Sequence, residues 1–193
     1  MGYLGRGLRC LWQRRQHRGL LPMASPRFEP GPPDENAIEL ARVVDRAVRS
    51  SEILDMKSLF IEEGKVYGLY IDIYVLDYDG NYFDAAMLAS MSALRNASIP
   101  EYRDGKLDRD SKGRPLNPSG NAVECTFVKI GGHLLLDPSL DEDHTYDARL
   151  TIGVCGGKLC TMQKRGRGAI TRAELEKMVD VALEKAPELE KHL

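Results

Sequence analysis

Apolar and polar residues alternate with a helical period over residues 34–50, the clearest pattern in the chain. Asp34 is a suitable N-cap, and Asp34 and Glu35 place negative charge at the positive end of the helix dipole. The apolar positions recur at the spacing of a single buried stripe. They are Ala37, Leu40, Ala41, Val44 and Val48. We therefore predict an amphipathic helix from Asp34 to about Ser50.

Three arginines occupy the opposite side of this predicted helix. At 100° per residue, Arg42, Arg46 and Arg49 lie within roughly 60° of one another. A row of this kind is most often a solvated helix face. Guanidinium groups one turn apart can also contact neighbouring phosphates of a nucleic acid. The pattern alone leaves both interpretations open.

The rest of the chain reads as a mixture of strands and helices, which predicts an α+β domain. The segment Leu69–Tyr78 is apolar on both faces, as in a central strand covered by helices. A capping box of Thr171 and Glu174 marks the start of a C-terminal helix. In chain order, we predict two strands within 59–78, a helix over about 84–95, a surface loop over 101–121, two hairpins with turns at Gly131-Gly132 and Gly156-Gly157, and a helix over 171–186.

Composition limits how the protein can bind its partners. The chain has 193 residues, of which 42% are hydrophobic, enough for one domain with a buried core. Its 27 basic and 29 acidic residues give a net charge of −2, so a nucleic-acid site must be local. No apolar run approaches the roughly 18 residues of a membrane helix, which predicts a soluble protein with no membrane partner.

The four cysteines form no C-x-x-C pair. This predicts free thiols in a reducing compartment, the cytoplasm, with a disulfide between Cys155 and Cys160 as the alternative.

Residues 1–20 differ from the rest of the chain, with five arginines and no acidic residue. An organellar presequence and an RNA-binding arm both fit this composition, whereas a secretory signal lacks its apolar centre. We interpret 1–20 as an atypical basic leader that is disordered or wrongly framed coding sequence, and 21–193 as the folded domain.

Several acidic motifs resemble metal sites at first sight. Asp77–Asp84 begins like a calcium loop, but its glycine comes fourth instead of sixth, so we predict a turn before a helix. Asp141–His144 cannot converge on one metal pair from adjacent positions and is typical of a solvated loop. His133 follows a hairpin turn, where a surface histidine is expected. With no phosphate loop or nucleophile elbow in the sequence, we predict no metal and no cofactor.

Two longer runs are more specific: FEPGPPDENAIELARVVDR at 28–46 and VECTFVKIGGHLLLDPSLDED at 123–143. They closely resemble the RNase PH family, and within it the non-catalytic ring subunit of the archaeal exosome. The resemblance implies an RNase PH-like (ribosomal protein S5 domain 2-like) β-α sandwich. It covers about 21–193, the C-terminal two thirds of the family domain, so we expect an N-terminally truncated domain that lacks the first third.

The resemblance also implies partners and a function. Three copies of the subunit alternate with three of a catalytic RNase PH-like subunit in a hexameric ring, which degrades single-stranded RNA from its 3′ end by phosphorolysis. RNA-binding cap proteins of the exosome complete the expected partners. In this family the arginines of the ARVVDR element line the RNA path, which assigns RNA binding to Arg42 and Arg46; no motif includes Arg49 firmly.

Catalytic relatives grip the phosphate with a Gly-Ser-Arg stretch. Here Gly80-Asn81-Tyr82 stands in its place, without the hydroxyl donor and the bidentate cation. Asp147 falls near the catalytic aspartate of the active relatives, but one carboxylate without a phosphate clamp is not a reaction centre. We therefore predict no catalytic residue and a role in binding RNA. The alternatives are an active phosphorolytic 3′-to-5′ exoribonuclease and a non-functional fragment of the family.

Overall fold

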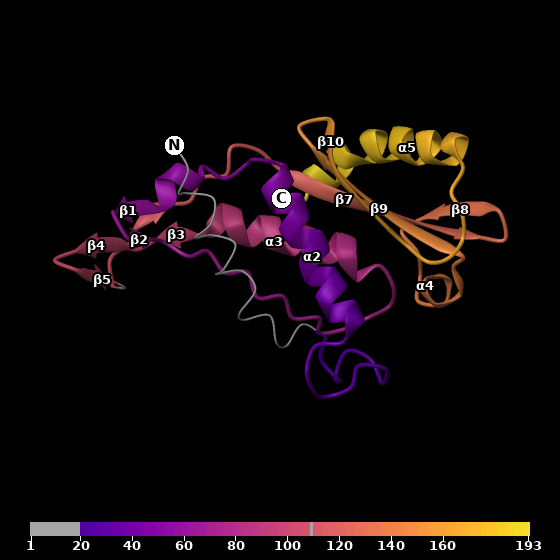
Figure 1. Ribbon diagram of the computed structural model, residues 1–193, viewed down its shortest axis with the longest axis horizontal. Coiled ribbons are helices and arrows are strands. Elements are labelled where there is room, and N and C mark those ends of the chain that lie inside the picture. The colour runs from indigo at the N-terminus through magenta and orange to yellow at the C-terminus, as the bar shows by residue number, and fades with distance from the viewer. Residues whose placement is uncertain (1–19, 109) are drawn as a thin grey trace.

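The computed structural model describes residues 20–108 and 110–193. A sheet with helices on both faces occupies one end of an elongated molecule, and short two-stranded sheets occupy the other (Figure 1). The elements are α2 (Glu35–Ser50), a 3-10 helix (Met56–Leu59), β1 (Phe60–Glu62), β2 (Lys65–Val66), α3 (Tyr82–Asn96), β3 (Ser98–Ile99), β4 (Glu101–Arg103), β5 (Lys106–Asp108), β6 (Arg114–Pro115), β7 (Ala122–Ile130), β8 (His133–Leu136), α4 (Glu142–Thr145), β9 (Ala148–Cys155), β10 (Lys158–Arg165) and α5 (Arg172–Glu190).

The main sheet is antiparallel, in the order β10-β9-β7-β8. Both predicted hairpins are confirmed, with turns at the two Gly-Gly pairs. All four of these glycines have positive φ, between 53° and 88°, a conformation that glycine adopts without steric cost. The long pairing of β7 with β9 makes these two strands the rigid centre of the sheet.

Each face of the sheet is covered by its own helices (Figure 1). On one face, Cys125 and Phe127 of β7 pack with α5 residues such as Met178. On the other face, Thr126 bonds to Asp84 of α3. Since successive strand residues point to opposite faces, β7 alternates between two cores. Helices thus pack on both faces of the sheet, in agreement with the β-α sandwich that the resemblance implies.

Helix α2 begins where the sequence predicts. The Asp34 side chain accepts a hydrogen bond from the Ala37 N–H at 2.8 Å, which caps the helix. Its buried face is wider than the predicted stripe, because Val43 and Ala47 also join the core. Two residues of the predicted stripe, Ala37 and Ala41, are only half-buried. The buried residues are Leu40, Val43, Val44, Ala47 and Val48. This width reflects contact with α3 on one side and with β10 on the other.

The two other long helices are also confirmed. Helix α3 starts two residues before the predicted position, after Asn81 in the left-handed conformation. The capping box of Thr171 and Glu174 is present at the start of α5. This helix continues through Pro187 to Glu190, beyond the predicted end.

The prediction of a central strand at Leu69–Tyr78 is wrong. Among the described residues, the strand pairing of this segment is limited to an isolated parallel bridge between Leu20 and Val75. Its side chains still alternate. Ile71, Ile73 and Val75 face the core of α2 and α3, whereas Tyr70, Tyr74 and Leu76 are exposed. The apolar residues on its second face therefore signal exposed surface here and not a second covering layer.

The predicted loop over 101–121 also needs correction. Strands β4 and β5 form a hairpin, and β6 pairs with β3. The hairpin turn is Asp104-Gly105, with φ of 49° and 79°. Asp-Gly is a strong signal for a two-residue hairpin, which the high polarity of this segment concealed.

Residues 1–19 of the predicted leader lie outside the described residues. Of that segment only Leu20 is described, in its bridge to Val75. The cysteines that the structure describes, Cys125, Cys155 and Cys160, are free thiols. None of the described helices has both the length and the apolar character needed to cross a membrane.

Candidate functional site

Helix α2 presents its three arginines away from the core, as its period predicts. The side chain of Arg46 is half-buried, whereas Arg42 and Arg49 are exposed. They differ in their partners. Arg49 forms an ion pair with Asp45 one turn earlier, and Arg46 donates from Nη1 to the Gln163 Oε1 at 2.6 Å. Arg42 makes no hydrogen bond or ion pair with any residue that the structure describes.

Arg42 and Arg46 line a shallow groove between α2 and β10. Its volume is about 390 Å³. The lining residues are Glu35, Ile38, Glu39, Arg42, Val43, Arg46, Gln163, Lys164 and Arg165. The strand β10 lies at the edge of the main sheet, and α2 packs against it. The groove is therefore built by one helix and one edge strand.

The acidic residues of the groove already have cationic partners. Glu39 bonds to Arg165 and also to Arg149, the latter at 2.8 Å. Glu35 lies 3.8 Å from Arg165 and is otherwise exposed. The charges of Arg42 and Arg46 are therefore left without a carboxylate partner among the described residues. Uncompensated guanidinium groups in an open groove are suited to binding phosphate oxygens.

A buried ion network adjoins this groove through Glu39, which lines the groove. Arg149 lies between Glu39 and Asp143, with its Nη1 3.4 Å from an Asp143 carboxylate oxygen. Its guanidinium also stacks on the ring of Phe83 at 4.2 Å. Burial lowers the pKa of Arg149, but the charge of Glu39 and its other neighbours raises it further, so the group stays protonated. Tyr78 donates to Asp143 at 2.7 Å and closes the network.

Residues Gly80, Asn81 and Tyr82 form a structural turn. A side chain at residue 80 would collide with the backbone of Pro138 at 2.3 Å, so only glycine fits. The buried Asn81 donates to two carboxylates, Asp84 at 2.8 Å and Asp137 at 2.7 Å. Tyr82 is buried against Phe83. The amide of Asn81 is therefore committed to two carboxylates, and this turn joins the start of α3 to the segment that follows β8.

Asp147 also has a structural role. Its carboxylate accepts a hydrogen bond from the Gly131 N–H at 3.0 Å, and its backbone N–H bonds to the carbonyl of Lys129. Its carbonyl accepts from the Gly168 N–H at 2.7 Å. These bonds tie the β7–β8 turn to the start of β9.

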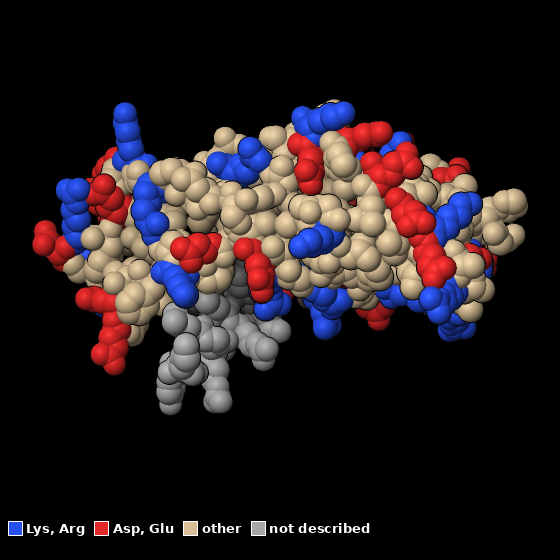
Figure 2. Space-filling model, turned by 90° about the horizontal axis from the view of Figure 1, so that it is seen from above, with Lys and Arg blue, Asp and Glu red and all other residues tan. Residues whose placement is uncertain are grey.

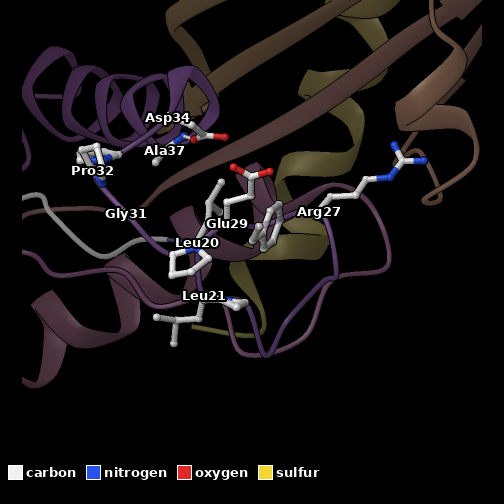
Figure 3. Close-up of a pocket in the computed structure, with 12 residues that line it drawn as sticks. Leu20, Leu21, Arg27, Glu29, Gly31, Pro32, Asp34 and Ala37 are labelled. Carbon is white, nitrogen blue, oxygen red and sulfur yellow. Dashed lines mark hydrogen bonds between the residues drawn. The ribbon is translucent and has the colours of Figure 1, made fainter.

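A second hollow lies beside the loop that precedes α2 (Figure 3). It has a volume of about 600 Å³ and is lined largely by leucine, proline and backbone. Asp34 is used for capping, and the side chain of Arg27 extends away from the other labelled residues (Figure 3). Within the described part of the chain, this hollow has no converging set of polar groups.

Charge elsewhere on the surface is mixed. The face seen in Figure 2 carries lysine, arginine, aspartate and glutamate side by side, without a large field of one sign. Among the described residues no group of three histidine, cysteine, aspartate or glutamate side chains could hold a metal ion. The groove of α2 and β10 is therefore the best candidate site.

Comparisons with known proteins agree with this architecture. The model of the 3′ exoribonuclease family matches with its domain 1 at residues 16–100 and with its domain 2 at residues 120–185. The chain is also 40% identical, with a TM-score of 0.81, to a solved chain of the Archaeoglobus fulgidus exosome with RNA bound to the active site, of which it covers 71%. That match extends over 91% of this chain.

This chain belongs to the RNase PH family of 3′ exoribonucleases. Its similarity extends to an archaeal exosome core, with a TM-score of 0.76 and 35% identity over 92% of this chain and 69% of the solved one. It is 50% identical to the exosome complex component Rrp42 of Methanothermobacter thermautotrophicus over 180 residues. That alignment covers 90% of this chain and 66% of the relative. The chain thus spans slightly less than two thirds of this relative's length, and 63% of that of the Aeropyrum pernix Rrp42 component.

Helical periodicity predicted that Arg42 and Arg46 share one face of this RNase PH domain's helix α2, but it did not predict the β10 residues beside them. Gln163 and Arg165 lie on β10, more than 100 residues away in the chain from the α2 groups that they contact. The only available signal was their alternation: they are two residues apart on a strand and so share a face. The buried ion pairs of Arg149 were not predicted from the sequence. This residue occurs in an otherwise apolar strand, far in the chain from its partner Glu39.

Two acidic residues are buried on the α3 side of the sheet. Burial raises the pKa of Asp84 to about 6, although hydrogen bonds from Asn81 and Thr126 lower it. Glu124 is fully buried, and neither of its carboxylate oxygens has a partner among the described residues. Burial, and then the charge of Asp84, raise the pKa of Glu124 well above its usual value.

We expect Glu124→Met to raise the free energy of unfolding by about 1–3 kcal/mol at pH 8, because it removes an unpaired buried carboxyl. A pKa raised by folding means that the folded state binds more protons, so wild-type stability falls as pH rises above the unfolded pKa of about 4.3. The gain from the substitution should therefore shrink toward pH 4. Urea unfolding at both pH values measures it, with the exposed Glu184→Met as control. A loss of stability at both values would contradict this.

Proposed function

We propose that this chain is a non-catalytic subunit of an archaeal-type exosome ring. It binds single-stranded RNA through Arg42 and Arg46, and it structures the active site of a catalytic RNase PH-like partner for 3′-to-5′ phosphorolysis. The two subunits alternate in a hexameric ring in the cytoplasm, together with RNA-binding cap proteins. The observation that carries the proposal is the groove of α2 and β10, with its two uncompensated guanidinium groups.

The geometry of the groove suits RNA of any sequence. Arg42 and Arg46 are one helical turn apart, and an α-helix rises about 5.4 Å per turn, close to the spacing of neighbouring phosphates in a strand. Contacts to phosphate oxygens position a strand without reading its bases. A subunit that passes RNA toward a processive degrading site needs this indifference to sequence. The Archaeoglobus fulgidus relative, an exosome with RNA bound to the active site, supports RNA as the ligand.

The turn at Gly80-Asn81-Tyr82 supports a non-catalytic role. An attacking phosphate needs donors and cations that stabilise its charge in the transition state. Here the buried Asn81 is committed to Asp84 and Asp137, and both of these groups disfavour an anion. Asp147 is likewise held by backbone groups. The RNA would therefore be cut in the catalytic partner and held by this chain.

A phosphorolysis assay tests the proposal. We expect the purified chain alone to release no nucleoside diphosphates from single-stranded RNA in the presence of inorganic phosphate, whereas the ring assembled with a catalytic partner releases them. Asp147→Asn in this chain should leave the activity of that ring unchanged, because Asp147 only holds a turn. Phosphate-dependent shortening by the chain alone, abolished by Asp147→Asn, would instead support the active exoribonuclease.

A further inference from the structure

The described partner of Arg46 is a neutral amide, whereas Arg165, which also donates to the amide oxygen of Asn36, has a carboxylate partner as well. Arg49 and Arg165 each bond to a carboxylate, which neutralises their charge. Arg46 bonds to an uncharged amide oxygen at 2.6 Å. A neutral acceptor fixes one N–H of the guanidinium and leaves its full charge and its remaining donors available.

The amide of Gln163 is itself held in place. Its Nε2 donates to the backbone carbonyl of Lys164 at 3.4 Å, so its Oε1 is turned toward Arg46. Gln163 pairs with Thr151 in the register of β10 with β9, which anchors it to the centre of the sheet. Arg46 is thus connected through one side chain to the main sheet.

We infer that Gln163 is a positioning residue for RNA binding, which holds the Arg46 guanidinium in the groove without neutralising it. This inference rests on the proposed function of Arg46. A free arginine side chain samples many rotamers, and ordering it opposes binding; a guanidinium held in advance avoids part of that cost. Gln163 acts through Arg46 and does not itself contact the phosphate.

The test is a double-mutant cycle in the ring assembled with a catalytic partner, with an unstructured oligoadenylate as the RNA. Gln163→Met keeps the length of the side chain and removes the amide. We expect it to weaken binding about 2–10-fold, the range of one neutral hydrogen bond, without changing the slope of log affinity against log salt. In an Arg46→Met background the same substitution should have no further effect.

Matched variants separate this role from a structural one. Gln163→Ala should reproduce Gln163→Met, whereas Thr161→Val, two residues earlier on the same strand face, should change nothing. Size and thermal unfolding of each ring verify assembly. An equal effect of Gln163→Met in both backgrounds, or no effect in either, would overturn the inference. If Arg46→Met alone left binding unchanged, the proposed function of Arg46 would be wrong. If Arg46→Met weakened binding and Gln163→Met did not, only the inference about Gln163 would be wrong.

Discussion

The double substitution Arg42→Glu/Arg46→Glu is expected to weaken binding of single-stranded RNA to the assembled ring at least about 100-fold at an ionic strength of about 0.1 M. A hydrogen bond to a charged group contributes about 1.5–3 kcal/mol, so losing two removes about 3 kcal/mol or more. Degradation should slow in parallel at limiting RNA concentration. Ring assembly should persist, because both side chains project into the groove and away from the core of this chain.

The control for this experiment reverses two charges elsewhere. Arg172 and Lys177 are exposed on α5, which covers the other face of the sheet. Arg172→Glu/Lys177→Glu changes the net charge equally and should alter affinity by less than about threefold, since exposed charges beyond a Debye length of about 10 Å are screened. Equal effects of the two double variants would mean that the groove has no special part in binding.

Removing Arg149 is expected to have the largest effect on stability. Arg149→Leu leaves Asp143 without a cation among the described residues and Glu39 with Arg165 alone, and breaking a buried ion network from one side costs about 3–5 kcal/mol. The stacking on Phe83 is lost as well. Urea unfolding should show the free energy of unfolding fall by that amount, with a lower midpoint and an unchanged m value. Arg172→Leu, which breaks an exposed pair with Glu176, should cost less than about 1 kcal/mol.

A small effect of Arg149→Leu would show that water or rearrangement compensates the two carboxylates. A double variant with Asp143→Asn distinguishes the cases, because Asp143 is the carboxylate that Arg149→Leu leaves without a cation among the described residues. Part of the lost stability should then return. The comparison reports whether Arg149 stabilises the protein mainly through Asp143.

Local signals in the sequence predicted most of the helices and hairpins correctly. The cap at Asp34, the capping box at Thr171 and the two Gly-Gly turns each act over a few residues, so a short window contains their whole cause. The segment Leu69–Tyr78 was mispredicted because strand pairing depends on neighbours that are distant in the chain. Its apolar residues alone do not distinguish a covered face from an exposed one.

The site was predictable only in part, for the same reason. Helical periodicity placed Arg42 and Arg46 on one face, and the structure agrees. Residues of β10 determine which α2 charges lack an ion pair. Arg165 forms an ion pair with Glu39, and Gln163 accepts a hydrogen bond from Arg46. These contacts join residues more than 100 positions apart, so no local pattern could reveal them.

The salt dependence of RNA binding tests the central claim most directly. For single strands the slope of log affinity against log salt is about −0.7 per phosphate neutralised, so Arg42→Ala/Arg46→Ala should make the slope of the assembled ring shallower by about 1.4. Arg49→Ala, which removes a cation already paired with Asp45, should leave the slope unchanged. An unchanged slope in the Arg42→Ala/Arg46→Ala ring would contradict the account and return these arginines to a solvated helix face.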